Sequence, residues 1–255
     1  MKPLIYLLLF IVACFTSTAF TKEIEGTLID TAKIKLYVGK TPRPSVILSH
    51  GCDGLATKYT DWANAIDKMG FNVVMYDSYA PMKLTKIPCE MDGQWWLAHS
   101  DERPKEAEIV ARWIKQQSWH TGKVGLIGFS AGGAVALNYA NIKNDYGDNI
   151  SAVVAFYPAC DHFVIGPKSD LATSSWTVKI PTQIQNGSAD DWTPSYLCNI
   201  NNAEIITYPN ATHAFDRDEG VGGVRTYLGH KMRYDKEIHN QSKVKVKEFF
   251  DKHIN

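Results

Sequence analysis

The chain has 255 residues, of which 45% are hydrophobic, and its 27 basic residues balance its 27 acidic residues. A balanced charge offers no basic surface for a phosphate backbone, so nucleic acid is not expected as a partner. The sequence has no glycine-rich phosphate loop, no dinucleotide-binding motif and no C-x-x-C pair, so we expect neither a metal nor an organic cofactor.

Residues 1–19 have the parts of a secretory signal peptide. Lys2 precedes an apolar run over 4–15, and small residues follow it. The run is shorter than the roughly 20 residues that span a bilayer, so no transmembrane span is expected once the signal is removed. We place cleavage after Ala19 and expect the mature protein to be exported, either to the periplasm or outside the cell. A lipoprotein signal, in which Cys14 would be acylated, is the alternative.

Strands and helices alternate along the remainder of the chain, residues 20–255. Apolar periodicity predicts strands at 23–28, 33–38, 45–50, 72–76, 123–129, 152–157, 182–185 and 203–208. It predicts helices at 59–69, 103–118, 131–143 and 234–253, with long irregular segments at 78–100 and 159–178. The first two strands are expected to form an antiparallel hairpin at the sheet edge. The alternation predicts one α/β domain with a mostly parallel sheet and helices on both faces.

The segment Gly128-Phe-Ser130-Ala-Gly132 lies between a predicted strand and a predicted helix. A G-x-S-x-G sequence in this context indicates a nucleophile elbow, a sharp turn that presents the serine hydroxyl at the end of the sheet. The two glycines are needed because side chains at their positions would collide in such a turn. Ser130 is therefore the candidate nucleophile.

A serine hydroxyl needs a base in contact with it and an acid that orients the base, and in this type of fold they follow in the order serine, acid, histidine. His213 follows the strand at 203–208 by a short turn, so it is the candidate base. The other histidines beyond Ser130 precede the acid or lack a strand leading into them: His162, His230, His239 and His253.

The candidate acid lies in the loop that follows the strand at 182–185. Asp190 and Asp191 both lie there, and only one of them can orient His213. We choose Asp190, which leaves Asp191 as a solvated or helix-capping residue. Pro194 then marks the start of the next helix.

An acyl transfer also needs two preset donors for the oxyanion, usually backbone amides. The amide of Ala131, directly after the nucleophile, is one candidate. The amide of Cys52 is the other, in a loop where Gly51 and Gly54 allow close approach to a ligand. We interpret His50 as a buried residue that braces this loop.

Five segments in this order resemble the dienelactone hydrolase family of α/β-hydrolases: His50-Gly-Cys-Asp-Gly54, Asp77-Ser78, Gly128-Phe-Ser-Ala-Gly-Gly133, Gly187-x-x-Asp190-x-x-x-Pro194 and His213-Ala-Phe-Asp216. The resemblance runs from about residue 45 to the C-terminus and implies an α/β-hydrolase fold. It implies Ser130, Asp190 and His213 as the catalytic triad, with the amides of Cys52 and Ala131 as the oxyanion hole. Dienelactone hydrolase itself uses a cysteine nucleophile, so the serine argues against dienelactone as the substrate.

The expected fold also suggests how the four remaining cysteines pair. Cys52 with Cys89 and Cys160 with Cys198 lie after strands that such a fold brings close, and disulfides are common in exported proteins. Three tryptophans are candidates for the wall of an acyl pocket, with core packing as the alternative: Trp95, Trp96 and Trp192.

The sequence thus predicts an exported serine hydrolase that cleaves a small ester or lactone through an acyl-enzyme. Peptidase or acyltransferase chemistry with the same triad is an alternative, although the chain has no gating domain. A hydrolase-like envelope protein without activity is a further alternative. The sequence leaves the natural substrate and the oligomeric state open.

Overall fold

The computed structural model describes residues 28–30, 33–99, 101–160, 176–218 and 223–255. The predictions of a signal peptide and of a lipid anchor at Cys14 lie outside these residues, as does His162. Among the described residues, no helix is both long and apolar enough to cross a membrane.

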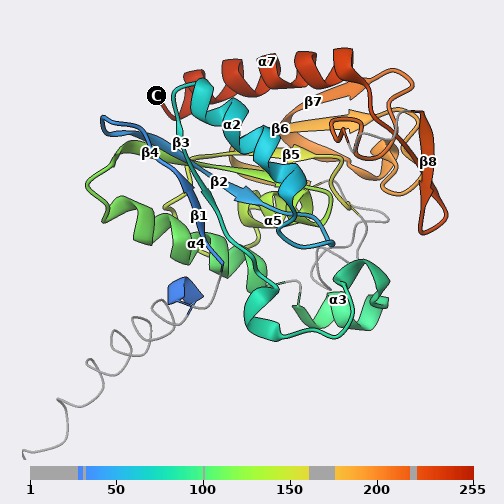
Figure 1. Cartoon of the computed structure of the whole chain (residues 1–255), viewed down its shortest axis with the longest axis horizontal. Coiled ribbons are helices and arrows are strands. Elements are labelled where there is room, and N and C mark those ends of the chain that lie inside the picture. The colour runs from blue at the N-terminus through green and yellow to red at the C-terminus, as the bar shows by residue number, and fades with distance from the viewer. Residues whose placement is uncertain (1–27, 31–32, 100, 161–175, 219–222) are drawn as a thin grey trace, which may run out of the picture.

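A seven-stranded sheet forms the centre of the fold, in the order β1-β3-β2-β4-β5-β6-β7 (Figure 1). The strands are β1 (Lys35–Tyr37), β2 (Arg43–Ser49), β3 (Asn72–Met75), β4 (His120–Phe129), β5 (Ala152–Phe156), β6 (Trp176–Gly187) and β7 (Ile200–Tyr208). β1 is antiparallel to β3, and all other neighbouring strands in this sheet are parallel. The predicted mostly parallel sheet is confirmed.

The central strands contain continuous apolar stretches, such as 46–48 in β2 and 152–156 in β5, because both faces of the sheet are covered. In β2, Val46 and Leu48 belong to one apolar cluster and Ile47 to the other. Successive side chains of a strand point to opposite faces, so a strand buried on both sides has no polar alternation. The loops that carry the site follow the ends of these strands.

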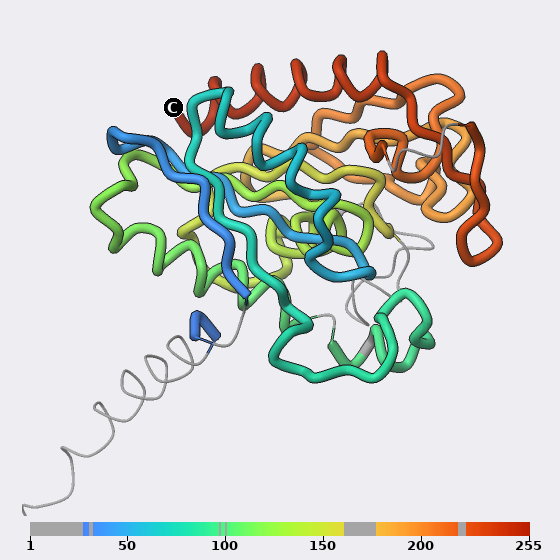
Figure 2. The backbone as a smooth tube through the Cα atoms, viewed as in Figure 1, coloured from blue at the N-terminus to red at the C-terminus, as the bar shows by residue number. Residues whose placement is uncertain are grey.

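Helices pack on both faces of the sheet, as the sequence predicts (Figure 1). On one face lie α2 (Thr60–Lys68) and α7 (Lys236–His253), and on the other α4 (Glu102–Lys115) and α5 (Ala131–Ala140). Although α2 and α7 are far apart in the sequence, they lie side by side (Figure 2). Lys243 Nζ donates a hydrogen bond to Asp61 Oδ2 across 2.8 Å between them.

The predicted N-terminal hairpin lies partly outside the described residues, which omit 1–27 and 31–32. Residues 28–30 are helical, and β1 pairs antiparallel with β3 in the register Leu36↔Val74, which confirms an antiparallel N-terminal strand at the edge of the sheet. The segment 78–100 is not irregular throughout, because it contains the helix α3 (Gly93–His99) and two short 3-10 helices, η2 (Ala80–Met82) and η3 (Pro88–Glu90).

The segment before the C-terminal helix, where the sequence predicts neither a strand nor a helix, forms regular structure. It contains a two-stranded hairpin, β8 (Val224–Tyr227) and β9 (His230–Arg233). Neither strand shows the apolar alternation that a buried strand would have, so no periodic pattern predicts this hairpin.

Candidate active site

The turn between β4 and α5 places Ser130 at the edge of the sheet. Ser130 has φ 55° and ψ −114°, which an L-residue adopts only under strain. A Cβ at Gly128 would lie 1.9 Å from the Gly132 carbonyl oxygen, and one at Gly132 would lie 2.1 Å from the Ser49 carbonyl oxygen. No side chain fits at either position, so the G-x-S-x-G sequence is a steric requirement of this turn.

His213 lies in the loop after β7, within hydrogen-bond distance of the serine. Its Nε2 is 3.1 Å from Ser130 Oγ, and its Nδ1 is 2.9 Å from Asp190 Oδ2. Since the carboxylate accepts the hydrogen bond, the proton of the neutral ring resides on Nδ1 and the lone pair of Nε2 faces the hydroxyl. The Ser130 hydroxyl can therefore pass its proton to His213.

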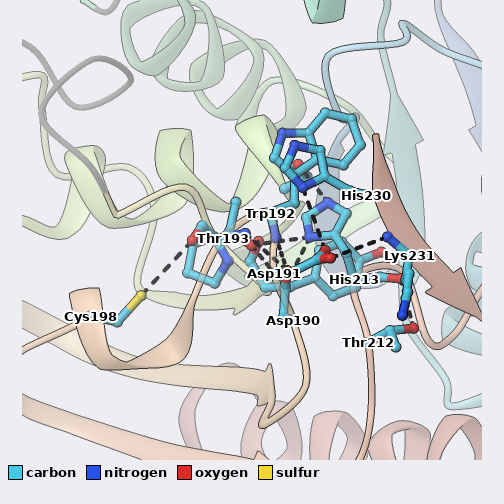
Figure 3. Close-up of polar contacts among 12 residues, drawn as sticks. Asp190, Asp191, Trp192, Thr193, Cys198, Thr212, His213, His230 and Lys231 are labelled. Atoms are coloured by element: carbon cyan, nitrogen blue, oxygen red, sulfur yellow. Dashed lines mark hydrogen bonds and ion pairs between the residues drawn. The ribbon is translucent and has the colours of Figure 1, made fainter. Parts of the chain in front are cut away.

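Asp190 lies in the loop after β6 and is buried (Figure 3). Its Oδ1 accepts hydrogen bonds from the backbone amides of Trp192 and Thr193, each at 2.9 Å. Burial by itself would raise the pKa of Asp190, but the neighbouring His213 and the hydrogen bonds from His213 and Thr193 outweigh it and lower the pKa. The carboxylate is thus kept ionised beside the imidazole.

Asp191 points toward a different partner, as Figure 3 shows. Its Oδ1 lies 3.4 Å from Nδ1 of His230, and its side chain is 49% exposed. His230 in turn stacks on Trp192, with ring centroids 4.8 Å apart. Of the two adjacent carboxylates, only Asp190 contacts His213.

Thr193 was not among the residues singled out in the sequence, although it belongs to the same hydrogen-bond network. Its Oγ1 lies 2.9 Å from Asp190 Oδ2, 3.0 Å from His213 Nδ1 and 3.0 Å from the Tyr157 carbonyl oxygen. The hydroxyl can donate to the carboxylate or the carbonyl and accept from Nδ1–H. Its place directly before Pro194, in the segment that carries Asp190, is the only sequence signal that could have indicated it.

The loop after β2 forms a tight turn in which Gly54 N–H donates to the Gly51 carbonyl oxygen at 3.3 Å. Cys52, inside this turn, and Ala131, at the start of α5, line one cavity together with Ser130. The two residues that the sequence predicts for the oxyanion hole therefore flank the candidate nucleophile.

The His50 side chain supports this turn through hydrogen bonds. It is fully buried, its Nδ1 donates to the Gly51 carbonyl oxygen at 2.7 Å, and its Nε2 accepts from the Ser78 amide at 3.1 Å. Burial, and next the Arg103 guanidinium, lower the pKa of His50 well below its usual range. The ring is therefore neutral and fixed in one tautomer, as a bracing residue must be.

Two further polar residues that the sequence did not reveal hold the same turn. Arg103, from α4, donates to the His50 carbonyl oxygen at 2.7 Å, and Tyr59 accepts from the Gly51 amide at 2.7 Å. Both come from helices whose sequence shows only that they pack against the sheet, so no local pattern marks these contacts.

The cleft at Ser130 has two lobes, which share Cys52, Cys89, Ser130 and Trp192. One lobe, of about 190 Å³, carries three cationic side chains: Lys58, Arg217 and Arg225. Asp53 forms ion pairs with the first two of these.

The other lobe, of about 290 Å³, is mainly apolar. Its remaining lining residues are Met91, Gly93, Trp96, Ala131, Ala159 and Thr193. Trp192 and Trp96 thus line the cleft, whereas Trp95 contacts Tyr79, Trp96 and His99.

Both disulfides expected from the sequence are present. Cys52 is bonded to Cys89, and Cys160 to Cys198. No group of three or more histidine, cysteine or acidic side chains in the described residues is arranged to hold a metal ion.

Residues 34–254 match the sequence model of the dienelactone hydrolase family. The chain belongs to this family. Its members are hydrolases, and a small-molecule substrate follows from the family. No curated protein sequence gave a significant match.

Solved structures of low sequence identity share the α/β-hydrolase fold. The dienelactone hydrolase-like promiscuous phosphotriesterase P91, from metagenomic libraries, is 16% identical, with a TM-score of 0.68 over 88% of this chain and 93% of that one. A dienelactone hydrolase from Anabaena variabilis is 16% identical, with a TM-score of 0.57 over 88% and 93% of the two chains. The Pyrococcus furiosus esterase Pf2001 is 17% identical, with a TM-score of 0.58 over 89% and 90%.

Proposed function

We propose that this member of the family is a serine hydrolase that cleaves small carboxylic esters or lactones through an acyl-enzyme. The observation that carries the proposal is the hydrogen-bond chain from Ser130 Oγ to His213 Nε2, at 3.1 Å, and from His213 Nδ1 to Asp190 Oδ2, at 2.9 Å. This is the arrangement that activates a serine hydroxyl.

The reaction begins when Ser130 Oγ attacks the acyl carbon and its proton moves to His213 Nε2. The amides of Cys52 and Ala131 stabilise the negative charge that develops on the carbonyl oxygen. Collapse of the tetrahedral intermediate breaks the bond to the alcohol oxygen, which takes the proton from Nε2. Water, activated by the same imidazole, then attacks the acyl-enzyme and releases the acid. Asp190 stays ionised throughout and stabilises the imidazolium.

The cysteines and the N-terminal segment support a proposal about the compartment. Two disulfides persist in an oxidising environment, and residues 1–19 have the composition of a signal peptide. We therefore propose export, to the periplasm or outside the cell. Cell fractionation and N-terminal sequencing of the mature protein test this, with a new N-terminus at Phe20 as the expected result.

The triad is tested with Ser130→Ala. We expect the wild type to hydrolyse p-nitrophenyl acetate and to react with a fluorophosphonate probe, and the variant to do neither while unfolding at an unchanged temperature. Turnover and labelling that survive the substitution would contradict the proposal. A wild type that folds but neither turns over nor labels would instead indicate a hydrolase-like protein without activity.

A further inference from the structure

Residues 80–99, here called the covering segment, stand apart from the rest of the fold. Figure 1 shows α3 outside the layers formed by the sheet and its flanking helices. Among the described side chains of the segment, Pro88 is the only one that is buried. The segment therefore has no apolar core of its own to fix its position.

Apart from the turn at its start, where the Ala80 and Met82 amides donate to the carbonyl oxygens of Asp77 and Tyr79, no hydrogen bond of its described residues attaches the covering segment to the body. The hydrogen bonds formed by its described residues join positions three or four apart, as between Trp95 N and Asp92 Oδ1 or His99 Nδ1 and the Trp95 carbonyl oxygen. Such bonds maintain turns and short helices, but they do not link the segment to the sheet.

The disulfide supplies that link. Cys89, in η3, is bonded to Cys52, which lies in the turn after β2 beside Ser130. Just beyond Cys89, the segment places Met91 and Trp96 in the wall of the larger lobe, which Trp192 also lines. One covalent bond thus holds an apolar wall against the candidate nucleophile.

We propose that the tethered covering segment forms the subsite for the apolar part of the substrate, with Trp96 and Met91 as specificity-determining residues and the Cys52–Cys89 disulfide as the element that positions them. The inference rests on the proposed function and deepens it, since it assigns the chemical class of the group that flanks the scissile bond. An unbranched alkyl or an aryl group fits, because the wall is thioether and indole and carries no charge.

The expected gain in affinity for a longer substrate scales with the apolar surface of the substrate that the wall covers. Each methylene group moved from water to an apolar wall contributes about fourfold in affinity. Wild-type enzyme should therefore prefer p-nitrophenyl hexanoate over p-nitrophenyl acetate, or hexyl acetate over ethyl acetate, in kcat/KM. The two series show whether the acyl or the alcohol part occupies the lobe.

The wall is tested with Trp96→Ala, for which Trp95→Ala is the matched control. Both substitutions remove an indole from α3, but only Trp96 lines the lobe, while Trp95 lies behind it and contacts Tyr79, Trp96 and His99. We expect the ratio of kcat/KM for the long substrate to that for the short one to fall about tenfold or more in Trp96→Ala, mainly through KM, and to stay within about twofold in Trp95→Ala.

The tether is tested with the double variant Cys52→Ser/Cys89→Ser. The control is Cys160→Ser/Cys198→Ser, because the second disulfide closes a nearly equal loop, with a sequence separation of 38 against 37, and lines neither lobe. We expect the ratio of kcat/KM for the long substrate to that for the short one to fall about tenfold in the first variant only. An equal ratio in wild type, in Trp96→Ala and in the first double variant would overturn the proposal.

A readout without turnover separates this inference from the proposed function. Hexyl p-nitrophenyl ether has no scissile acyl bond, and its binding can be measured by calorimetry. Weaker binding to Trp96→Ala and to Cys52→Ser/Cys89→Ser, but not to the two controls, would support the subsite even if no ester were hydrolysed. Equal binding to all five proteins would refute the subsite even if the wild type proved to be an active esterase.

Discussion

Nε2 of His213 lies 3.1 Å from Oγ of Ser130, although 83 positions separate the two residues in the chain. Ser130 follows β4 and His213 follows β7, and these strands are not neighbours in the sheet. The contact forms because the parallel strands β4 to β7 all end at the same edge of the sheet, where the loops after them meet. The topology therefore assembles the candidate site.

The first prediction separates the two adjacent carboxylates. Asp190→Asn should lower kcat/KM by about a thousandfold or more, because an amide stabilises neither the required tautomer of His213 nor its charged form. Asp191→Asn removes the same charge one residue away, from a side chain that contacts His230 instead. We expect it to change kcat/KM by less than about twofold. Steady-state kinetics on p-nitrophenyl acetate decide between them, and similar losses in both variants would show that the assignment of Asp190 is wrong.

The second prediction concerns Thr193 as a positioning residue. Thr193→Val keeps the shape of the side chain but removes the hydroxyl that contacts both Asp190 and His213. The buried carboxylate then loses one of its hydrogen bonds, which costs about 1–3 kcal/mol. We expect kcat/KM to fall about tenfold. We also expect the acidic limb of the pH profile of kcat/KM to shift, because the hydroxyl supports the ion pair between Asp190 and His213 and its loss weakens that pair.

The variant Thr193→Ser controls for the loss of the hydroxyl. It restores the hydroxyl without the methyl group, and we expect it to recover most of the activity and the wild-type pH profile. If valine lowers only the melting temperature, Thr193 acts on the fold alone and the positioning role is refuted.

The parts of the site that could be predicted from sequence are those with a local steric or chemical requirement. The turn at Ser130 tolerates no side chain at Gly128 or Gly132, so the requirement appears in the sequence as a motif. Buried strands such as β5 appear as continuous apolar runs, because both of their faces are covered. The two cysteine pairings followed from the fold once its family resemblance was known.

The parts that could not be predicted depend on contacts between distant elements. Arg103 is a charged residue in a helix by sequence, and only the packing of α4 places its guanidinium on the His50 carbonyl oxygen. The hairpin of β8 and β9 has no apolar alternation, because it lines the cleft and Met232 is its only strand residue buried in the core. Helix α3 lies in a segment whose described side chains are mostly not buried. Such a segment shows little of the apolar periodicity from which a helix is predicted.

The third prediction compares the stability that each disulfide provides. Their sequence separations, 37 and 38, are almost equal, so each constrains the unfolded chain to a similar extent. In the chain-entropy model, a loop of this size corresponds to about 4 kcal/mol. We expect Cys52→Ser/Cys89→Ser and Cys160→Ser/Cys198→Ser to lose similar free energies of unfolding in urea, about 2–4 kcal/mol each. A large loss in one variant and none in the other would show that native-state contacts, rather than chain entropy, dominate the difference.

The fourth prediction follows from the neutral, buried His50. Its pKa is well below the usual value in the folded state, because burial and next the Arg103 charge disfavour the imidazolium. In the unfolded chain the ring titrates near its ordinary pKa of about 6.5. Below that pH the unfolded state binds one more proton than the folded state, so the stability that His50 contributes is complete above about pH 6.5 and is lost as the pH falls toward the folded pKa.

The variant His50→Gln isolates this contribution from that of other groups. Glu106, whose pKa burial raises to about 7, has the opposite dependence, since its folded state keeps a proton that the unfolded state loses as the pH rises. Glu106 is present in both proteins, so its effect cancels in the difference between wild type and variant. We expect the stability advantage of wild type over His50→Gln, measured by urea unfolding, to be about 1.4 kcal/mol smaller at about pH 5.5 than at about pH 7.5. An advantage that does not change over this range would mean that His50 binds a proton in the folded protein and does not brace the turn as a neutral ring.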